Sequence, residues 1–143
     1  MKRTGPLKIA VLVAALFLPL APQSFGGPEP GVSQAGDMKL IRAVMCESIE
    51  GYEPKNSAVA FSINVGKISC FTSFSDIKSA TAALHKWFRR EELVTTKRLT
   101  LKPPTWSTYS SIQLREADKG PWRVEIWDDH NNLLRTLRFS VTD

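Results

Sequence analysis

The chain has 143 residues, with 19 Lys and Arg, 14 Asp and Glu, and a formal net charge of +5. This length suits a single domain with one hydrophobic core. The excess of bases would fit a nucleic-acid-binding surface, but Lys2, Arg3 and Lys8 belong to the N-terminal segment before the first apolar run. Without them 16 bases stand against 14 acids, a net charge of +2, and we expect no nucleic-acid partner.

The N-terminal segment has the organisation of a secretory signal peptide. Basic residues precede an uncharged apolar run at residues 9–20, and the small residues Ser24 and Gly26 follow at the spacing of a signal-peptidase site. The apolar run is too short for a membrane span of about 20 residues. We predict a signal peptide over residues 1–26 and an exported protein, periplasmic or extracellular, with no transmembrane segment in the mature chain.

The rest of the chain is predicted to be a linker followed by short strands. Residues 27–37 are rich in Gly and Pro and bury too little apolar surface to order themselves, so the folded domain spans residues 38–143. Residues 51–62 are predicted to be mostly loop, with Phe61 as an apolar anchor. Continuous or alternating apolar patterns predict strands at residues 38–49, 65–74, 93–102, 105–114, 121–128 and 133–141.

Residues 76–90 carry two competing periods. Helical spacing joins Ile77, Ala80, Leu84, Trp87 and Phe88. A strand would instead place His85 and Trp87 on one face and Lys86 on the other, with residues 89–92 as a hairpin turn. The local pattern favours the helix, but that helix would have to pass into the next strand without a glycine stop. The segment alone leaves both structures open.

The two cysteines, Cys46 and Cys70, are predicted to form a disulfide. An even number of cysteines in an oxidising compartment favours a bridge. Metal binding is the alternative, but no Cys-x-x-Cys motif or histidine pair accompanies them. A disulfide closing this loop would stabilise the fold by roughly 3 kcal/mol. We expect no metal site and no cofactor.

Five short motifs follow one another along the mature chain: Cys70-Phe71-Thr72, His85-x-Trp87, Trp106-x-Thr108-Tyr109-Ser110, Gly120-x-Trp122-x-Val124 and Phe139-x-Val141. In this order they resemble the bacterial family of unknown function numbered 2914. Ser107 and Tyr109 depart from the pattern, since the family tends to have arginine and tryptophan there. The resemblance implies a β-rich exported or membrane-attached domain with no assigned reaction.

The resemblance favours a strand within residues 76–90. We therefore predict an all-β, immunoglobulin-like two-sheet β-sandwich of about seven strands, with an α+β fold carrying a helix over residues 76–90 as the alternative. Trp87 and Trp106 are expected to pack between the sheets. The motif residues expected to have structural roles are His85, Trp87, Trp106, Thr108, Ser110 and Trp122.

His85 is the candidate for catalysis. It could act as a general base if a serine of residues 107–111 lay within about 3 Å, and Asp128 or Asp129 could orient its ring. The chain lacks a Gly-x-Ser-x-Gly nucleophile elbow, so we expect a structural histidine and keep a small hydrolase as an alternative. Residues 128–131 lack the spacing of a calcium loop and are predicted to form a hairpin turn.

Trp127 is the candidate for a binding platform. It falls in the opposite phase from Trp122, beside Arg123 and Glu125, and an exposed ring there could stack on a sugar or anchor a partner. The alternative is that a loop such as residues 50–62 covers it.

Basic residues gather on or near one predicted hairpin, and contact with an anionic polymer or an acidic partner is the corresponding hypothesis. These residues are Arg89, Arg90, Lys97, Arg98 and Lys102. Our prediction is a non-catalytic binding or assembly module of the bacterial cell envelope, with an envelope protein or anionic polymer as partner. A carbohydrate-binding module using Trp127 is the second candidate.

Overall fold

The structure, a computed structural model, describes residues 38–143. The predicted signal peptide and linker lie outside the described residues. Within the described part, no helix is long and apolar enough to cross a membrane. The elements in chain order are β1 (Lys39–Glu50), β2 (Glu53–Ser57), β3 (Ala60–Ser62), η1 (Ile63–Val65), β4 (Lys67–Ser75), β5 (Thr81–Arg89), β6 (Glu92–Leu101), β7 (Trp106–Gln113), η2 (Glu116–Asp118), β8 (Gly120–Asp128) and β9 (Leu133–Thr142).

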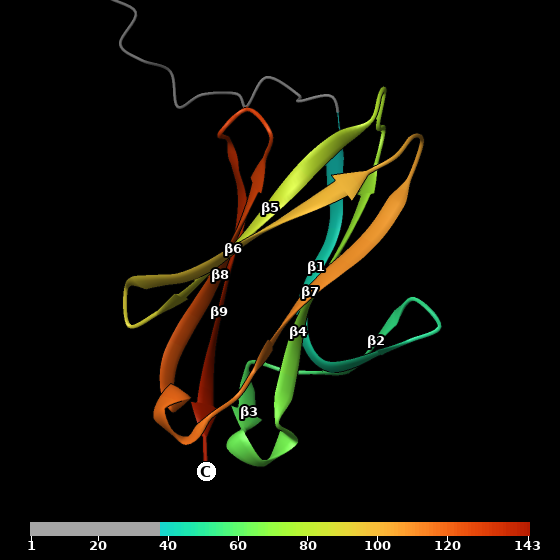
Figure 1. The fold of residues 1–143 in the computed structure, drawn as a ribbon. Coiled ribbons are helices and arrows are strands. Elements are labelled where there is room, and N and C mark those ends of the chain that lie inside the picture. Colours follow the sequence, from blue (N-terminus) through green and yellow to red (C-terminus); the bar gives the residue numbers. More distant parts are fainter. Residues whose placement is uncertain (1–37) are drawn as a thin grey trace, which may run out of the picture. The chain divides into compact units, whose positions relative to one another are not determined.

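The strands form two sheets that face each other (Figure 1). The four-stranded sheet has the order β2-β1-β4-β7, and the five-stranded sheet has the order β3-β9-β8-β5-β6. The predicted all-β, two-sheet sandwich is confirmed. It contains nine strands rather than about seven, because residues 51–62, predicted to be mostly loop, contribute the short edge strands β2 and β3.

Strand β5 resolves the ambiguity at residues 76–90, and the helical alternative is wrong. β5 pairs with β6 on one side and with β8 on the other, so its backbone hydrogen bonds are made across the sheet. His85 and Trp87 point inward with 0% exposure, while Lys86 lies on the opposite, half-buried face. Pairing on both sides and burial of one face outweigh the helical spacing, which is a purely local preference.

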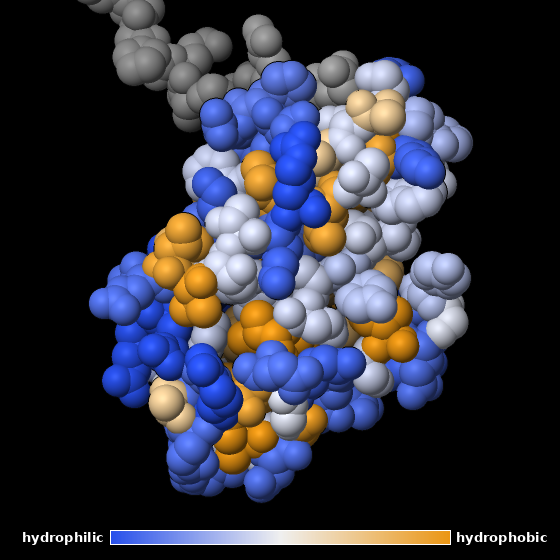
Figure 2. Space-filling view, viewed as in Figure 1, coloured by the Kyte–Doolittle hydropathy of each residue, from blue (hydrophilic) through white to orange (hydrophobic). Residues whose placement is uncertain are grey.

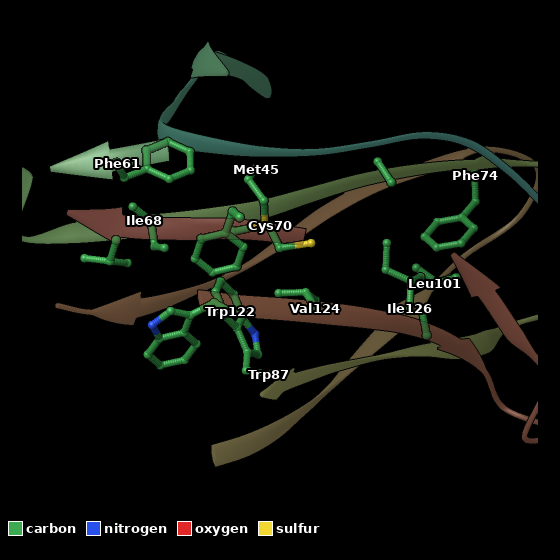
Figure 3. Packing of buried hydrophobic residues seen from close by; sticks show 14 of the residues in the cluster. Met45, Phe61, Ile68, Cys70, Phe74, Trp87, Leu101, Trp122, Val124 and Ile126 are labelled. Atoms are coloured by element: carbon green, nitrogen blue, oxygen red, sulfur yellow. The ribbon is translucent and has the colours of Figure 1, made fainter. Parts of the chain in front are cut away.

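The hydrophobic core lies between the sheets, and alternation along β8 shows how the sequence builds it. Trp122, Val124 and Ile126 are buried, and the residues between them are less so. Trp122 stacks on Phe139 with ring centroids 6.0 Å apart, and Trp87 meets the same ring edge-on at 6.2 Å. In Figure 3 the core runs from Phe61 and Ile68 at one end to Phe74, Leu101 and Ile126 at the other.

Cys46 and Cys70 are buried free cysteines, so the predicted disulfide is wrong. β1 pairs with β4 so that Met45 lies opposite Cys70, and Cys46 lies opposite Ser69. Because side chains alternate between the two faces of a strand, the two thiols point to opposite faces of the same sheet. The two cysteines therefore occupy neighbouring positions of paired strands, but their sulfurs do not face each other. Burial raises the pKa of both thiols.

Candidate functional site

A buried hydrogen-bond network joins the two sheets around His85. Its Nε2 lies 3.1 Å from Thr72 Oγ1 of β4, and its Nδ1 lies 2.7 Å from Ser110 Oγ of β7. Trp87 Nε1 donates to the same Ser110 oxygen at 3.1 Å. Of the motif residues with predicted structural roles, His85, Trp87 and Ser110 thus meet in one cluster.

The His85 network is closed to solvent. His85 and Thr72 are 0% exposed, and Ser110 is 6% exposed. Burial lowers the pKa of His85 to about 4, so the imidazole is neutral near pH 7. Each ring nitrogen meets a hydroxyl rather than a carboxylate. A serine of residues 107–111 does lie beside His85, as the hydrolase alternative required. The hydrogen bonds of the ring include no carboxylate, however, and both side chains are buried.

A groove of about 770 Å³ lies on the four-stranded sheet and its rim. The β1–β2 hairpin projects from this sheet (Figure 1), and Tyr52 at its turn forms one wall of the groove. Ile41, Tyr52 and Trp106 are 53%, 79% and 37% exposed. The full lining is Ile41, Tyr52, Ser73, Phe74, Ser75, Thr105, Trp106 and Ser107.

Trp106 lies at the rim of this groove, which corrects the expectation that it packs between the sheets. It pairs with Phe74 at the ends of β7 and β4. Phe74 is 2% exposed, whereas Trp106, the first residue of β7, is 37% exposed. The indole therefore lies at the end of the sandwich rather than inside it. Lys102 Nζ lies 5.7 Å from its ring centroid. Thr108, from the same motif, is half-buried on β7.

The groove carries no charged side chain in its lining. Its polar groups are hydroxyls of serine and threonine, and its largest surfaces are aromatic and aliphatic. On the face shown in Figure 2, apolar residues form separate patches divided by polar ones. The groove therefore fits an uncharged ligand surface better than an ionic one.

Trp127 lies on the outer face of the five-stranded sheet, opposite in phase to the buried Trp122 as predicted. It is half-buried. Lys86 Nζ lies 4.4 Å from its ring centroid, a cation–π contact, and the indole Nε1 donates to Glu125 Oε2 at 3.3 Å. The face that a sugar would stack on is therefore shared with the Lys86 ammonium.

The basic residues predicted on one hairpin divide between separate contacts. Arg89 donates to the buried carboxylate of Asp118 at 2.8 Å, and Arg98 donates to Asp129 at 2.7 Å. The Arg98 hydrogen bond holds the pKa of Asp129 below its usual value. Both arginines thus tie strands to neighbouring turns. Arg90 and Arg123 instead meet near Arg138 at a small cleft.

The turn at residues 128–131 is confirmed, and Asp128 shapes it. Oδ1 accepts hydrogen bonds from the backbone N–H groups of His130 and Asn132, and Oδ2 accepts from Asn132 Nδ2, each at 2.8 Å. Burial acts to raise the pKa of Asp128, but these hydrogen bonds outweigh it and the pKa is lowered. The carboxylate is therefore engaged by its own hairpin.

Sequence reasoning missed Ile41, Tyr52 and Arg138 as surface residues of interest. Ile41 follows Leu40 at a register irregularity of β1, which turns it outward, and no periodic pattern marks such a position. Tyr52 is a large aromatic residue directly after Gly51 in a polar turn, and that placement was the available signal. Arg138 lies far from the other arginines in sequence and reaches them only through β8–β9 pairing.

Residues 80–141 match the model of a family described as "Protein of unknown function (DUF2914)". This segment belongs to the DUF2914 family. The match contains β5 to β8 and all but the last residue of β9, and with them His85, Trp87, Ser110 and Trp122. The resemblance predicted from the motifs is confirmed over these residues. No curated protein matches the chain significantly.

Proposed function

We propose that the domain is an exported, non-catalytic binding or assembly module of the bacterial cell envelope, and that the groove on the four-stranded sheet holds the partner. The observation that carries the proposal is the exposure of Ile41, Tyr52 and Trp106 around one uncharged concave surface. Exposed apolar surface that lines a groove is typical of interaction sites, and tyrosine and tryptophan are the side chains that most often dominate binding energy. Export and envelope location rest on the N-terminal sequence.

The partner favoured for the groove is an envelope protein that presents an apolar, uncharged segment. The lining combines aromatic and aliphatic contact surface with hydroxyls that can donate or accept hydrogen bonds. A strongly charged ligand would find no counter-charge in it. Binding through this groove is therefore expected to change little between low and moderate salt.

A non-catalytic role is supported by the enclosure of the His85–Ser110 pair, which resembles a catalytic arrangement. Ser110 Oγ already accepts the Trp87 N–H and contacts His85 Nδ1. Attack on a substrate would require both that hydroxyl and the imidazole to reach solvent. The pair instead connects β5 to β7 inside the core, where it helps to fix how the two sheets are aligned.

The test is quantitative capture from a detergent extract of the native envelope, with the domain immobilised. The partner is the protein that the wild-type domain captures. Trp106→Ala and Tyr52→Ala are each expected to lower the captured amount of that protein at least about tenfold. Tyr109→Ala is the matched control, because Tyr109 is 48% exposed on the same strand as Trp106 but does not line the groove. Equal capture by all three variants would refute the groove as the binding surface.

A saccharide is the second candidate ligand, favoured by three aromatic side chains beside four serine and threonine hydroxyls in one uncharged groove. Aromatic faces stack on the apolar faces of sugar rings. Soluble peptidoglycan fragments and linear glucans, titrated into the labelled domain by NMR, would shift groove resonances in this case. Shifts lost in Trp127→Ala but kept in Trp106→Ala would place the sugar on the Trp127 face instead.

A further inference from the structure

We propose that Arg90, Arg123 and Arg138 form a binding site for a single oxyanion group, a phosphate or a carboxylate, on the outer side of the five-stranded sheet. The three arginines line a cleft of about 40 Å³ together with Phe88, Glu91 and Pro121. They come from the β5–β6 turn, from β8 and from β9, so only the folded sheet brings them together. The site is separate from the groove and does not depend on what the groove binds.

Arg123 is the fixed member of the site. Its guanidinium lies over the Phe88 ring, 4.0 Å from the centroid, and its side chain is only 14% exposed. It bonds to Glu91 at 2.6 Å and to Glu125 at 3.4 Å. Stacking on Phe88 and the bond to Glu125 hold the planar fork in one orientation, which lowers the entropy lost when a ligand binds.

Arg138 is the arginine of the site for which a bound anion would supply the missing acidic partner. It lies directly opposite Arg123 across the β8–β9 ladder, and like charges in that position destabilise a sheet. Arg123 has acidic partners, whereas Arg138 forms no salt bridge with any residue in the described range. An oxyanion placed between the two guanidiniums would offset their repulsion and satisfy the exposed fork of Arg138.

Arg90 is aimed at the cleft by the backbone around it. Arg90 and Glu91 both have positive φ, 48° and 70°, as required in a tight hairpin turn where Asn or Gly is usual. Arg90 Nη2 donates to Lys119 O at 3.2 Å. A Cβ on Gly120, whose φ is 121°, would lie 3.1 Å from Arg90 Nε, so the glycine leaves room for the guanidinium against the chain.

The size of the cleft and the place of Glu91 define the ligand class. The cleft is small, about 40 Å³, and three arginines surround it, so it suits the single charged group of a ligand. Arginine forks bind phosphate and carboxylate oxygens in pairs. The Glu91 side chain is 78% exposed and can swing away, so it acts as an internal competitor that an incoming oxyanion displaces from Arg123.

The test is an NMR titration of the arginine side-chain N–H signals with inorganic phosphate and with acetate, at constant ionic strength set by chloride. Saturable shifts at Arg123 are expected. Arg138→Gln should weaken the affinity at least about tenfold, and Glu91→Gln should strengthen it several-fold. The matched control is Arg135→Gln, which removes the same charge from an exposed position on β9 outside the cleft and should leave the affinity within about twofold.

Two outcomes would overturn the site: no saturable shift in the wild type, or equal weakening by Arg138→Gln and Arg135→Gln, which would reveal only general attraction to a basic surface. Tighter binding of phosphate than of acetate would identify a phosphoryl group as the natural ligand, and the reverse order would identify a carboxylate. Trp106→Ala should bind phosphate like the wild type, so failure of the groove proposal and failure of this one are separable.

Discussion

Acidification is expected to destabilise the domain through His85. The perturbation is protonation of an imidazole that is 0% exposed and bonded to two hydroxyls. Burial lowers its pKa from 6.5 to about 4, so the unfolded chain takes up the proton at a higher pH than the folded one. The stability that His85 contributes is therefore present above about pH 6.5 and is lost as the pH falls toward 4.

The size of this effect follows from the two pKa values. A pKa lowered from 6.5 to about 4 corresponds to about 3 kcal/mol when the histidine is fully titrated in both states. Between pH 7 and about pH 4.5 the free energy of unfolding should fall by about 2 kcal/mol. For a domain of this length, that loss lowers the melting temperature by roughly 10 °C.

The assay is thermal and urea unfolding followed by circular dichroism between pH 7 and about pH 4.5, a range above most of the carboxylate titrations. His85→Gln should remove most of the pH dependence in this window. If that variant does not fold, an NMR titration of the wild-type protein still tests the prediction. The His85 ring signals should stay those of the neutral form down to about pH 5. A stability independent of pH across the window, or protonation of His85 near pH 6.5, would refute the reasoning.

Two further predictions concern the core and the cysteines. Trp122→Ala is expected to cost roughly 3 to 5 kcal/mol, because Trp122 is 4% exposed and stacks on Phe139. Trp127→Ala should cost less than about 1 kcal/mol, since that ring is half-buried on the outer face of the sheet, beside the charged groups of Lys86 and Glu125; equal losses in chemical denaturation would mean that the phase of β8 is reversed. Reductant should leave the melting temperature unchanged, because Cys46 and Cys70 are free thiols, and a fall of several degrees with dithiothreitol would show that a disulfide forms after all.

Much of the sandwich could be predicted because the alternation of apolar and polar residues in a strand is visible within a short stretch of sequence. The alternation of Trp122, Val124 and Ile126 with charged residues predicted both β8 and its inward face. The hairpin turns at residues 90–91 and 128–131 were likewise predictable, since polar residues interrupt the apolar runs there. The same local signals misjudged β5, where helical spacing is present but sheet pairing on both sides decides.

The candidate sites were less predictable because each depends on register. The sequence offered a serine of residues 107–111 as a partner for His85 only as a possibility, because β5 and β7 belong to different sheets. A shift of one residue between β1 and β4 would have put Cys46 opposite Cys70 on the same face. The rim position of Trp106 likewise depends on where β7 begins relative to the end of β4.

The sequence by itself determined the fold class, the inward phase of most strands and the family of residues 80–141, because these depend on order and spacing along the chain. Only the tertiary structure decided which side chains meet. In the folded domain His85 is buried in the core, and the two thiols lie on opposite faces of one sheet. The groove lies beside Tyr52 and Trp106. Three arginines, Arg90, Arg123 and Arg138, line one cleft. The physical reason is that contacts between strands distant in sequence are set by register, sheet order and packing, which leave no periodic signal in the chain.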